Sequence, residues 1–542
     1  MKKKIKILLF ICFITGIILS FLSVAGAADR PFRMCDGWPC YIDPSKGTDS
    51  ASTESVLNLY DSLVLPDVKG IPQPLVAESW EISNDKKVWT FHLRTGIKFH
   101  DGTELTAEDV KFSMDRLTTI GEGFAYLFTK RVLSTEVVDN RTVAFHLNEP
   151  CGPFLSMLIR LYILNKDLVM KHIVKPGPYG DMGDYGKEWL NANDAGSGPY
   201  MLKEYLPQES VTMVVNPNYW KPLDPNVPDE FKIFNIKDEV TIKTMLANRE
   251  LEVGYAALTR EALEAMDKIK GIDITKFPAN SMLYYMMHTK KPPTDDVHFR
   301  KALAWGLDYK TIIEEIKIGS TYAASPVPKI CPGYDPTVLQ YHQDLDKARE
   351  ELKKSKYYNE LDKYPVTIYW NANRAEQEKI TLLFMSNMAE LGVKIISVKT
   401  PWMKLEEDTA SIERSPNVTT VEVAAEYAEA GAFLEAKYKS DSAKSWSQNE
   451  WLLDPELDAS IDDAIGTIDQ KERFAEYSKI LHYITEDLCP TIFLCDNTMT
   501  IPYQSDYVDW PGGHGIGNAV AYYDYYGPNI RIDKEKMLDL LK

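Results

Sequence analysis

The sequence predicts a mixed α/β protein made of at least two lobes. Its 542 residues exceed what one hydrophobic core usually serves. Short segments with the two-residue alternation of strands are interspersed with segments of helical periodicity. Because no internal repeat and no low-complexity linker divides the chain, we expect the lobes to pack together and not to form separate beads.

The N-terminus has the pattern of a secretory signal peptide. Lysines stand at positions 2, 3, 4 and 6, an apolar run covers residues 7–22, and Ala25-Gly26-Ala27 supplies the small residues before a cleavage site. The run is slightly shorter than a spanning helix, so a retained membrane anchor is the weaker alternative. Cys35 lies too far beyond the small residues for lipid attachment. We therefore expect residues 1–27 to be removed and the mature protein to be free in a periplasm.

The first half of the mature chain contains clear strand and helix signals. Residues 87–93 alternate polar and apolar and predict a half-buried strand, and the turn at 101–103 follows. Thr106 is suited to cap a helix that begins with acidic residues. Residues 137–147 predict a hairpin, and residues 210–215 predict a further strand.

The second half continues the alternation. Asp295-Asp296 precedes an apolar helical pattern, and Gly392 closes another one. The predicted helices cover residues 297–307, 375–391, 455–468 and 470–486, and the predicted strands cover residues 393–398 and 491–494.

The composition argues for a folded protein and against some partners. The chain is 44% hydrophobic and 26% charged, with a formal net charge of −18. This acidic balance disfavours nucleic acid and anionic membranes as partners and is compatible with a cationic ligand.

The sequence lacks the common enzyme motifs. It has no Gly-x-Ser-x-Gly elbow, no phosphate-binding Gly-rich loop with Lys and no His-Glu-x-x-His motif. The nine histidines are scattered, and no pair has metal-ligand spacing on a helix. We expect no catalytic residue, no metal site and no cofactor. A secreted hydrolase remains the alternative of another class.

Six cysteines follow the leader, at positions 35, 40, 151, 331, 489 and 495. An even number in an oxidising compartment permits disulfides, and the sequence cannot choose among the connectivities. Cys35 and Cys40 are close enough in sequence to close a tight loop. Cys489 and Cys495 flank a predicted strand, which holds them too far apart to bridge, so we expect them to pair elsewhere or to be buried.

Several motifs, taken in order, resemble one known family. The motifs are AESWEISNDKKVWTFHLRTGIKFHDGTELTAEDVKFSMDR at 77–116, GSGPY at 196–200, NPNYW at 216–220, PPTDDVHFRKAL at 292–303 and Asp308. Each motif is weak alone, but the ordered set resembles the extracellular solute-binding proteins of family 5. These are the dipeptide, oligopeptide and nickel receptors of ABC importers.

The resemblance implies a type II periplasmic-binding-protein clamshell of the large cluster C form. Lobe I would comprise residues 28–283, with an extra subdomain at about 66–194, and lobe II residues 284–490. Residues 491–542 would return to lobe I. Crossover strands are expected near residues 282–289 and 490–498. The expected partners are a small organic ligand, an oligopeptide above all, and the permease and ATPase subunits of the importer, with the protein itself a monomer.

The resemblance also suggests ligand-binding residues. In peptide-binding members an Asp-Tyr element holds the ligand's α-ammonium group, and Glu426-Tyr427 occupies that place here. A surface position for Glu426 is an equally good interpretation. An Arg and a Tyr hold the ligand's carboxylate in dipeptide receptors, and Asn371 and Asn373 stand at those places beside Trp370. Arg374 is one residue out of register, so a strict dipeptide receptor is disfavoured.

Aromatic side chains complete the predicted site. Tryptophans 38, 370, 402 and 446 and tyrosines 60 and 427 lie in segments that the family places around its cleft. Flat rings stack on ligand side chains or sugar faces, although core packing is the better interpretation for any one of them. An oligopeptide is favoured, and an oligosaccharide or a nickel-type chelator complex is the alternative.

Overall fold

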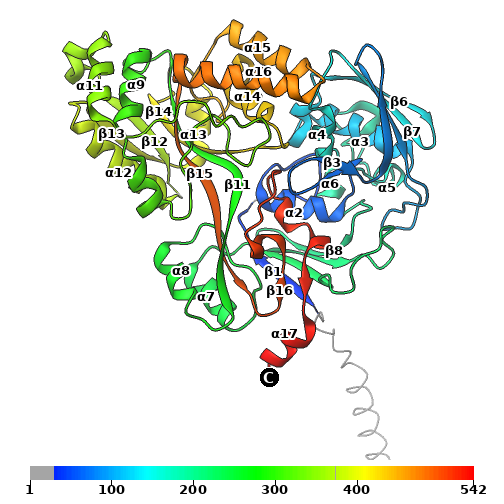
Figure 1. The fold of residues 1–542 in the computed structure, drawn as a ribbon. Coiled ribbons are helices and arrows are strands. Elements are labelled where there is room, and N and C mark those ends of the chain that lie inside the picture. The colour runs from blue at the N-terminus through cyan, green and yellow to red at the C-terminus, as the bar shows by residue number, and fades with distance from the viewer. Residues whose placement is uncertain (1–29, 39, 373) are drawn as a thin grey trace, which may run out of the picture.

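Two long antiparallel strands run through the middle of the molecule and join its two lobes (Figure 1). The computed structural model describes residues 30–38, 40–372 and 374–542. Strand β11 (Ile272–Met287) pairs with β15 (Thr491–Gln504) along almost its whole length. The register shifts between Pro278 and Met282, so the ladder is interrupted near its middle.

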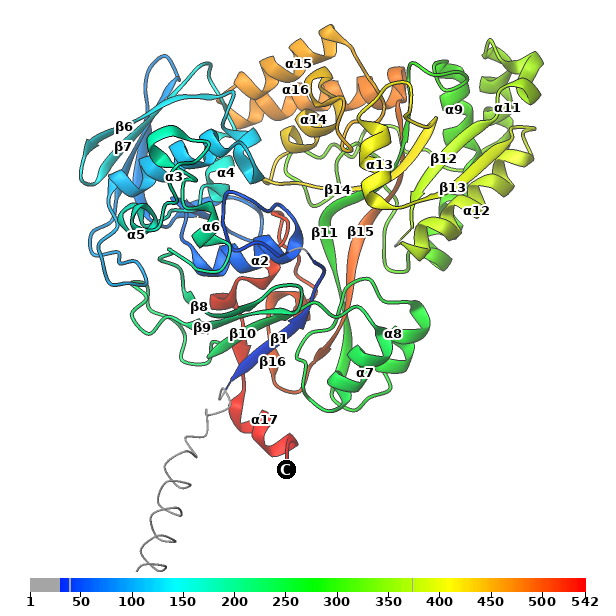
Figure 2. The same ribbon diagram turned by 180° about the vertical axis from the view of Figure 1, so that it is seen from behind.

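Lobe I is built around two four-stranded sheets (Figure 2). One has the order β1-β10-β9-β8, with β1 parallel to β10, and the other has the antiparallel order β4-β5-β7-β6. Its strands are β1 (Pro31–Cys35), β2 (Val64–Pro66), β3 (Pro72–Pro74), β4 (Ala77–Ile82), β5 (Val88–Leu93), β6 (Val132–Asp139), β7 (Thr142–Leu147), β8 (Tyr200–Leu206), β9 (Ser210–Val215), β10 (Glu230–Phe234), β16 (Val508–Asp509) and β17 (Arg531–Ile532).

The helices of lobe I start where the sequence supplies caps. Helix α3 (Ala107–Ile120) begins with a capping box, in which the side chains of Thr106 and Asp109 each accept a hydrogen bond from the backbone N–H of the other residue. The other helices are α2 (Ser50–Leu59), α4 (Phe154–Met157), α5 (Lys166–Lys171), α6 (Lys187–Leu190), α7 (Glu239–Ala247), α8 (Arg260–Met266) and α17 (Lys534–Leu540).

Lobe II is built around the sheet β13-β12-β14-β11-β15, to which the crossover strands contribute. The added strands are β12 (Val366–Asn371), β13 (Ile395–Thr400) and β14 (Val418–Ala424). The helices are α9 (Val297–Gly306), α10 (Tyr309–Thr311), α11 (Leu345–Lys354), α12 (Ala375–Ala389), α13 (Trp402–Thr409), α14 (Ala430–Tyr438), α15 (Pro455–Gly466) and α16 (Gln470–His482).

Helices α14, α15 and α16 lie between the lobe II sheet and the β4–β7 sheet in both views (Figures 1 and 2). Hydrogen bonds and ion pairs join this part of lobe II to lobe I. Gly152 N donates to Ile465 O at 2.7 Å, Lys130 pairs with Asp441 at 2.7 Å, and Arg131 pairs with Glu435. One hydrophobic cluster includes residues of both lobes. The lobes therefore touch directly, as in a closed clamshell.

The structure corrects two expectations about local structure. Strand β15 extends to Gln504, beyond both the strand predicted at residues 491–494 and the crossover strand expected near residues 490–498. Asp496 and Asn497 have low strand propensity, and the segment gains its pairing from β11. All six cysteines are buried and free. Cys40 Sγ lies 3.3 Å from Ser55 Oγ instead of bridging to Cys35. In the part of the chain that the structure describes, no helix has the length and apolar character to cross a bilayer.

Candidate ligand-binding site

Glu426 follows strand β14 of lobe II and meets Arg160 of lobe I. Arg160 Nε donates to the backbone oxygen of Glu426 at 2.8 Å, and its Nη2 lies 3.4 Å from Glu426 Oε2. The guanidinium also lies over the rings of Phe124 and Tyr523, at 4.7 and 5.3 Å from their centres. This contact joins the lobes beside the predicted ammonium anchor.

The Glu426 carboxyl is poorly compensated. Burial raises its pKa to about 7, against which the positive charge of Arg160 acts. Its Oε2 is buried and lies 3.4 Å from Arg160 Nη2, but it accepts no hydrogen bond from the residues that the structure describes. A buried carboxylate oxygen that accepts no hydrogen bond has capacity for an N–H or O–H group of a ligand.

Two tyrosines of lobe I lie within electrostatic range of Glu426. Tyr126 is 52% exposed, and desolvation raises the pKa of its hydroxyl well above the usual value, to which the charge of Glu426 adds. Tyr522 is similar, since desolvation and the charges of Glu426 and Glu422 raise its pKa. Its backbone has a φ of 72°, which is uncommon for a bulky residue and frequent at functional sites.

Arg374 lies at the same place on lobe II. It is the N-cap residue of helix α12, and its Nη1 is 3.8 Å from Glu376 Oε1. The charges of Glu422, Glu376, Tyr255 and Tyr522 act on the guanidinium and help to raise its pKa. The register argument set Arg374 aside, but the structure brings its guanidinium within electrostatic range of Glu422 and Tyr522. Both residues are distant from it in sequence, so the sequence alone does not reveal this.

The two asparagines and Trp370 lie on the same stretch. Asn371 ends strand β12, and its backbone N–H donates to Gln377 Oε1 at 2.9 Å. Asn373 lies outside the described residues. Trp370 is 3% exposed and donates from Nε1 to Ser397 Oγ at 2.9 Å, so the structure places it in the packing of lobe II.

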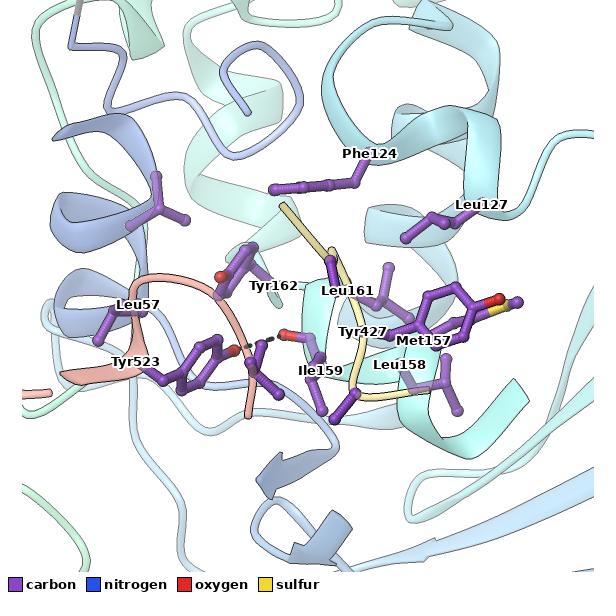
Figure 3. Close-up of a cluster of buried hydrophobic side chains, with 14 of the residues drawn as sticks. Leu57, Phe124, Leu127, Met157, Leu158, Ile159, Leu161, Tyr162, Tyr427 and Tyr523 are labelled. Atoms are coloured by element: carbon purple, nitrogen blue, oxygen red, sulfur yellow. Dashed lines mark hydrogen bonds between the residues drawn. The ribbon is translucent and has the colours of Figure 1, made fainter. Parts of the chain in front are cut away.

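Tyr427 projects into the core of lobe I. It is 1% exposed and lies among Leu127, Met157 and Leu158 (Figure 3). Its hydroxyl donates to Glu435 Oε2 at 3.0 Å. Glu426 and Tyr427 are therefore neighbours in sequence whose side chains have different surroundings.

The other predicted aromatic residues do not form one group. Trp402 and Trp446 pack edge to face, 5.5 Å apart, and both are partly buried. Trp38 stacks on Tyr205 at 6.2 Å. Tyr60 is 2% exposed, and its hydroxyl accepts from Ala195 N at 3.3 Å, which places it in the core of lobe I.

Sequence reasoning missed four residues of the site, namely Tyr126, Arg160, Tyr255 and Tyr522. They lie on lobe I, and the packing of the lobes brings Tyr126, Arg160 and Tyr522 near Glu426 and Tyr255 near Arg374. The aromatic run at 522–526 was the one available signal.

The fold and this arrangement define a class of protein. Two lobes joined by paired crossover strands bring charged and aromatic groups together where the lobes meet, as suits a receptor that captures a small solute. The sequence model of the bacterial extracellular solute-binding proteins, family 5, matches residues 72–445. The chain belongs to this family, as its motifs predicted.

Individual relatives cover most of the chain. The probable D,D-dipeptide-binding periplasmic protein DdpA of Escherichia coli is 28% identical over 427 residues, which are 76% of this chain and 77% of the relative. The periplasmic oligopeptide-binding protein OppA of Salmonella typhimurium is 26% identical over 505 residues, 86% and 87% of the two chains. Such relatives are binding proteins and not enzymes.

Solved structures show the same fold. The periplasmic binding protein DppA of Helicobacter pylori, in complex with the peptide STSA, matches with a TM-score of 0.77 and 23% identity over 93% of this chain and 99% of that one. NikZ of Campylobacter jejuni, in complex with Ni(L-His), matches with a TM-score of 0.78 and 18% identity over 93% and 100%. The predicted fold class is confirmed.

Proposed function

We propose that the chain is the receptor of an ABC importer and captures an oligopeptide or peptide-like solute through a cationic amino group. The observation that carries this proposal is the Glu426 carboxyl, whose Oε2 is buried beside Arg160 and accepts no hydrogen bond in the described part of the chain. The names of the peptide-binding relatives support the class of ligand. The permease and ATPase subunits of the importer would receive the solute.

An ammonium group suits the position beside Glu426. It would donate hydrogen bonds to the carboxylate and supply a second positive charge, which favours the ionised form of the carboxyl. Arg160 already touches the carboxylate on one side, so the ammonium would complete an alternating cluster of charges. Hydrogen bonds between charged partners contribute about 1.5–3 kcal/mol each.

Arg374, also on lobe II, supplies a positive charge for the other end of the solute. A guanidinium binds a carboxylate with two parallel hydrogen bonds. We assign it to the C-terminal carboxylate or to an acidic group of the solute. Asn371, at the end of β12, would then serve amide or hydroxyl groups. With Arg374 in place, a short peptide is no longer disfavoured.

Closure of the lobes would be coupled to binding. A ligand favours the closed state only if it contacts both lobes, and Glu426 and Tyr126 stand on opposite lobes. We place the boundaries between lobe I and lobe II at residues 283/284 and 490/491. The register shift between Pro278 and Met282 is a natural place for the hinge, because an interrupted ladder resists bending less. The mature receptor would be monomeric and free in the periplasm, its leader lying outside the described residues.

Calorimetric titration tests the amine anchor. The probes are Ala-Ala-Ala and its N-acetylated form, and the variants are Glu426→Gln and, as a control, Glu378→Gln, which changes an exposed carboxylate on helix α12. We expect wild type and Glu378→Gln to bind the free amine at least tenfold more tightly than the acetylated peptide. Glu426→Gln should remove that difference. Equal affinities for the two peptides in wild type would refute the anchor.

A further inference from the structure

A pocket of about 480 Å³ lies where loops of the two lobes meet. Lobe I contributes Val68 and Lys69, from the loop between β2 and β3, and Gly517, from the chain after β16. Lobe II contributes residues 329–334, which precede helix α11. Sites for small molecules usually occupy roughly 300–1,000 Å³, so this pocket has the size of a ligand site.

The pocket lies against both crossover strands. Lys329 N donates to Asp496 Oδ2 of β15 at 3.2 Å. Gly517 lies so close to β11 that a Cβ at this position would be 1.9 Å from the carbonyl oxygen of Pro278. The register of the β11–β15 ladder shifts after Pro278. The pocket therefore spans the two lobes next to the proposed hinge.

The pocket and the candidate site lie on opposite faces of these strands. On one face, Ser281 Oγ donates to Glu422 Oε1 at 3.3 Å and accepts from Asn497 Nδ2 at 3.0 Å. Glu422 is the carboxylate whose charge acts on Arg374 of the candidate site.

The residue before each of these two strand positions contacts the other face, as the alternation of side chains along a strand requires. Asn280 Nδ2 donates to the backbone oxygen of Ala519, close to Gly517, and Asp496 accepts from Lys329. The crossover strands thus separate an occupant of the pocket from a solute at Glu426.

The pocket combines apolar surface with positive charge. Val68, Ile330 and Tyr334 supply apolar surface, and Lys69 and Lys329 approach from opposite lobes. Both lysines are exposed, and neither ammonium forms an ion pair with another described residue. No carboxylate stands among the described residues that line the pocket. In a chain with a net charge of −18, such a pocket favours an anion.

We propose that this pocket is a second binding site, which takes a small organic anion with an apolar body, such as an aromatic carboxylate. The carboxylate lies between Lys69 and Lys329, and the apolar body covers Val68, Ile330 and Tyr334. Because such a ligand contacts both lobes, it favours the state in which they pack together. This site is additional to the capture of a solute at Glu426 and does not depend on it.

The test is calorimetric titration with three matched probes. 4-Phenylbutyrate has both features, butyrate lacks the ring, and 4-phenylbutylammonium reverses the charge. The variants are Lys69→Gln, Lys329→Gln and Val68→Trp, which fills the pocket from a side chain that is 44% exposed. The control is Lys353→Gln, which removes an exposed lysine of helix α11.

We expect wild type and Lys353→Gln to bind 4-phenylbutyrate at least tenfold more tightly than either of the other probes. Lys69→Gln and Lys329→Gln should each weaken it by about threefold or more, and Val68→Trp should remove measurable binding. Added salt should weaken binding to wild type, because exposed charges are screened. All variants should melt within a degree of wild type, since each replaces an exposed side chain.

The proposal is overturned if 4-phenylbutyrate does not bind, if the ammonium probe binds as well, or if the two lysine variants bind it as wild type does. Titration in the presence of Ala-Ala-Ala separates the two sites. Competitive displacement of 4-phenylbutyrate by the peptide would place the anion at the candidate site and overturn the second one. If 4-phenylbutyrate binding depends on both lysines while no peptide binds, the second site stands and the proposed function fails.

Discussion

Replacing Glu426 by Gln should change how the stability of the ligand-free protein depends on pH. Burial raises the pKa of Glu426 from 4.5 to about 7. The folded protein therefore holds a proton that the unfolded chain releases, and between these pH values the wild type loses stability as pH rises. Each pKa unit corresponds to about 1.4 kcal/mol, so the full loss is about 3 kcal/mol. Glutamine does not ionise and avoids this loss.

The assay is urea denaturation of both proteins, without ligand, at pH 4, 6 and 8. The free energy of unfolding of Glu426→Gln minus that of wild type should increase by about 3 kcal/mol from pH 4 to pH 8. Asp496 and Asp524, whose pKa values burial raises to about 6 and about 7, titrate in both proteins and cancel in the comparison. A difference that stays constant within 1 kcal/mol would mean that Glu426 ionises as an exposed carboxyl does, which would refute the burial of this carboxyl at the candidate site.

Three further predictions follow from the same contacts. Arg374→Gln should weaken a peptide with a free C-terminal carboxylate by roughly 10–150-fold while leaving the C-terminal amide unchanged, measured by calorimetry; an equal loss for both peptides would contradict the assignment. Tyr427→Phe should cost about 1 kcal/mol of stability and Tyr427→Ala about 3–5 kcal/mol, with the amine preference of the Phe variant intact, because the ring packs in the core and the hydroxyl bonds Glu435. The six buried thiols should react with a thiol reagent only after denaturation, and a reductant should leave the melting temperature unchanged; a melting temperature lowered by reductant would reveal a disulfide.

Much of the fold was predictable because its signals are local. The Thr106 cap, the Asp295-Asp296 helix start and the Gly392 helix end depend on residues within one or two turns. Strand β15 was predicted too short for the opposite reason, since residues 495–504 become a strand only by pairing with β11 more than two hundred positions earlier.

The candidate site likewise contains residues that local motifs reveal and residues that only the tertiary structure brings in. The proposal of Glu426 came from the motif that it occupies, whereas its partner Arg160 belongs to the other lobe and has no sequence signal. Tyr427 and Tyr60 were assigned to the ligand by their segments, but both side chains are buried, Tyr427 by packing between the lobes and Tyr60 within lobe I. Arg374 lies one residue beyond the family position in the sequence register, and its surroundings follow from the fold and not from that register.

Native mass spectrometry tests the central claim most directly. The receptor, stripped of ligand by unfolding and refolded, is offered a peptide digest, an oligosaccharide mixture and Ni(L-His) together, and retained ligands are released by collision and weighed. The proposed function predicts that peptides are retained and that Glu426→Gln retains fewer of them. Retention of a hexose series or of a nickel isotope pattern in place of peptides would contradict it.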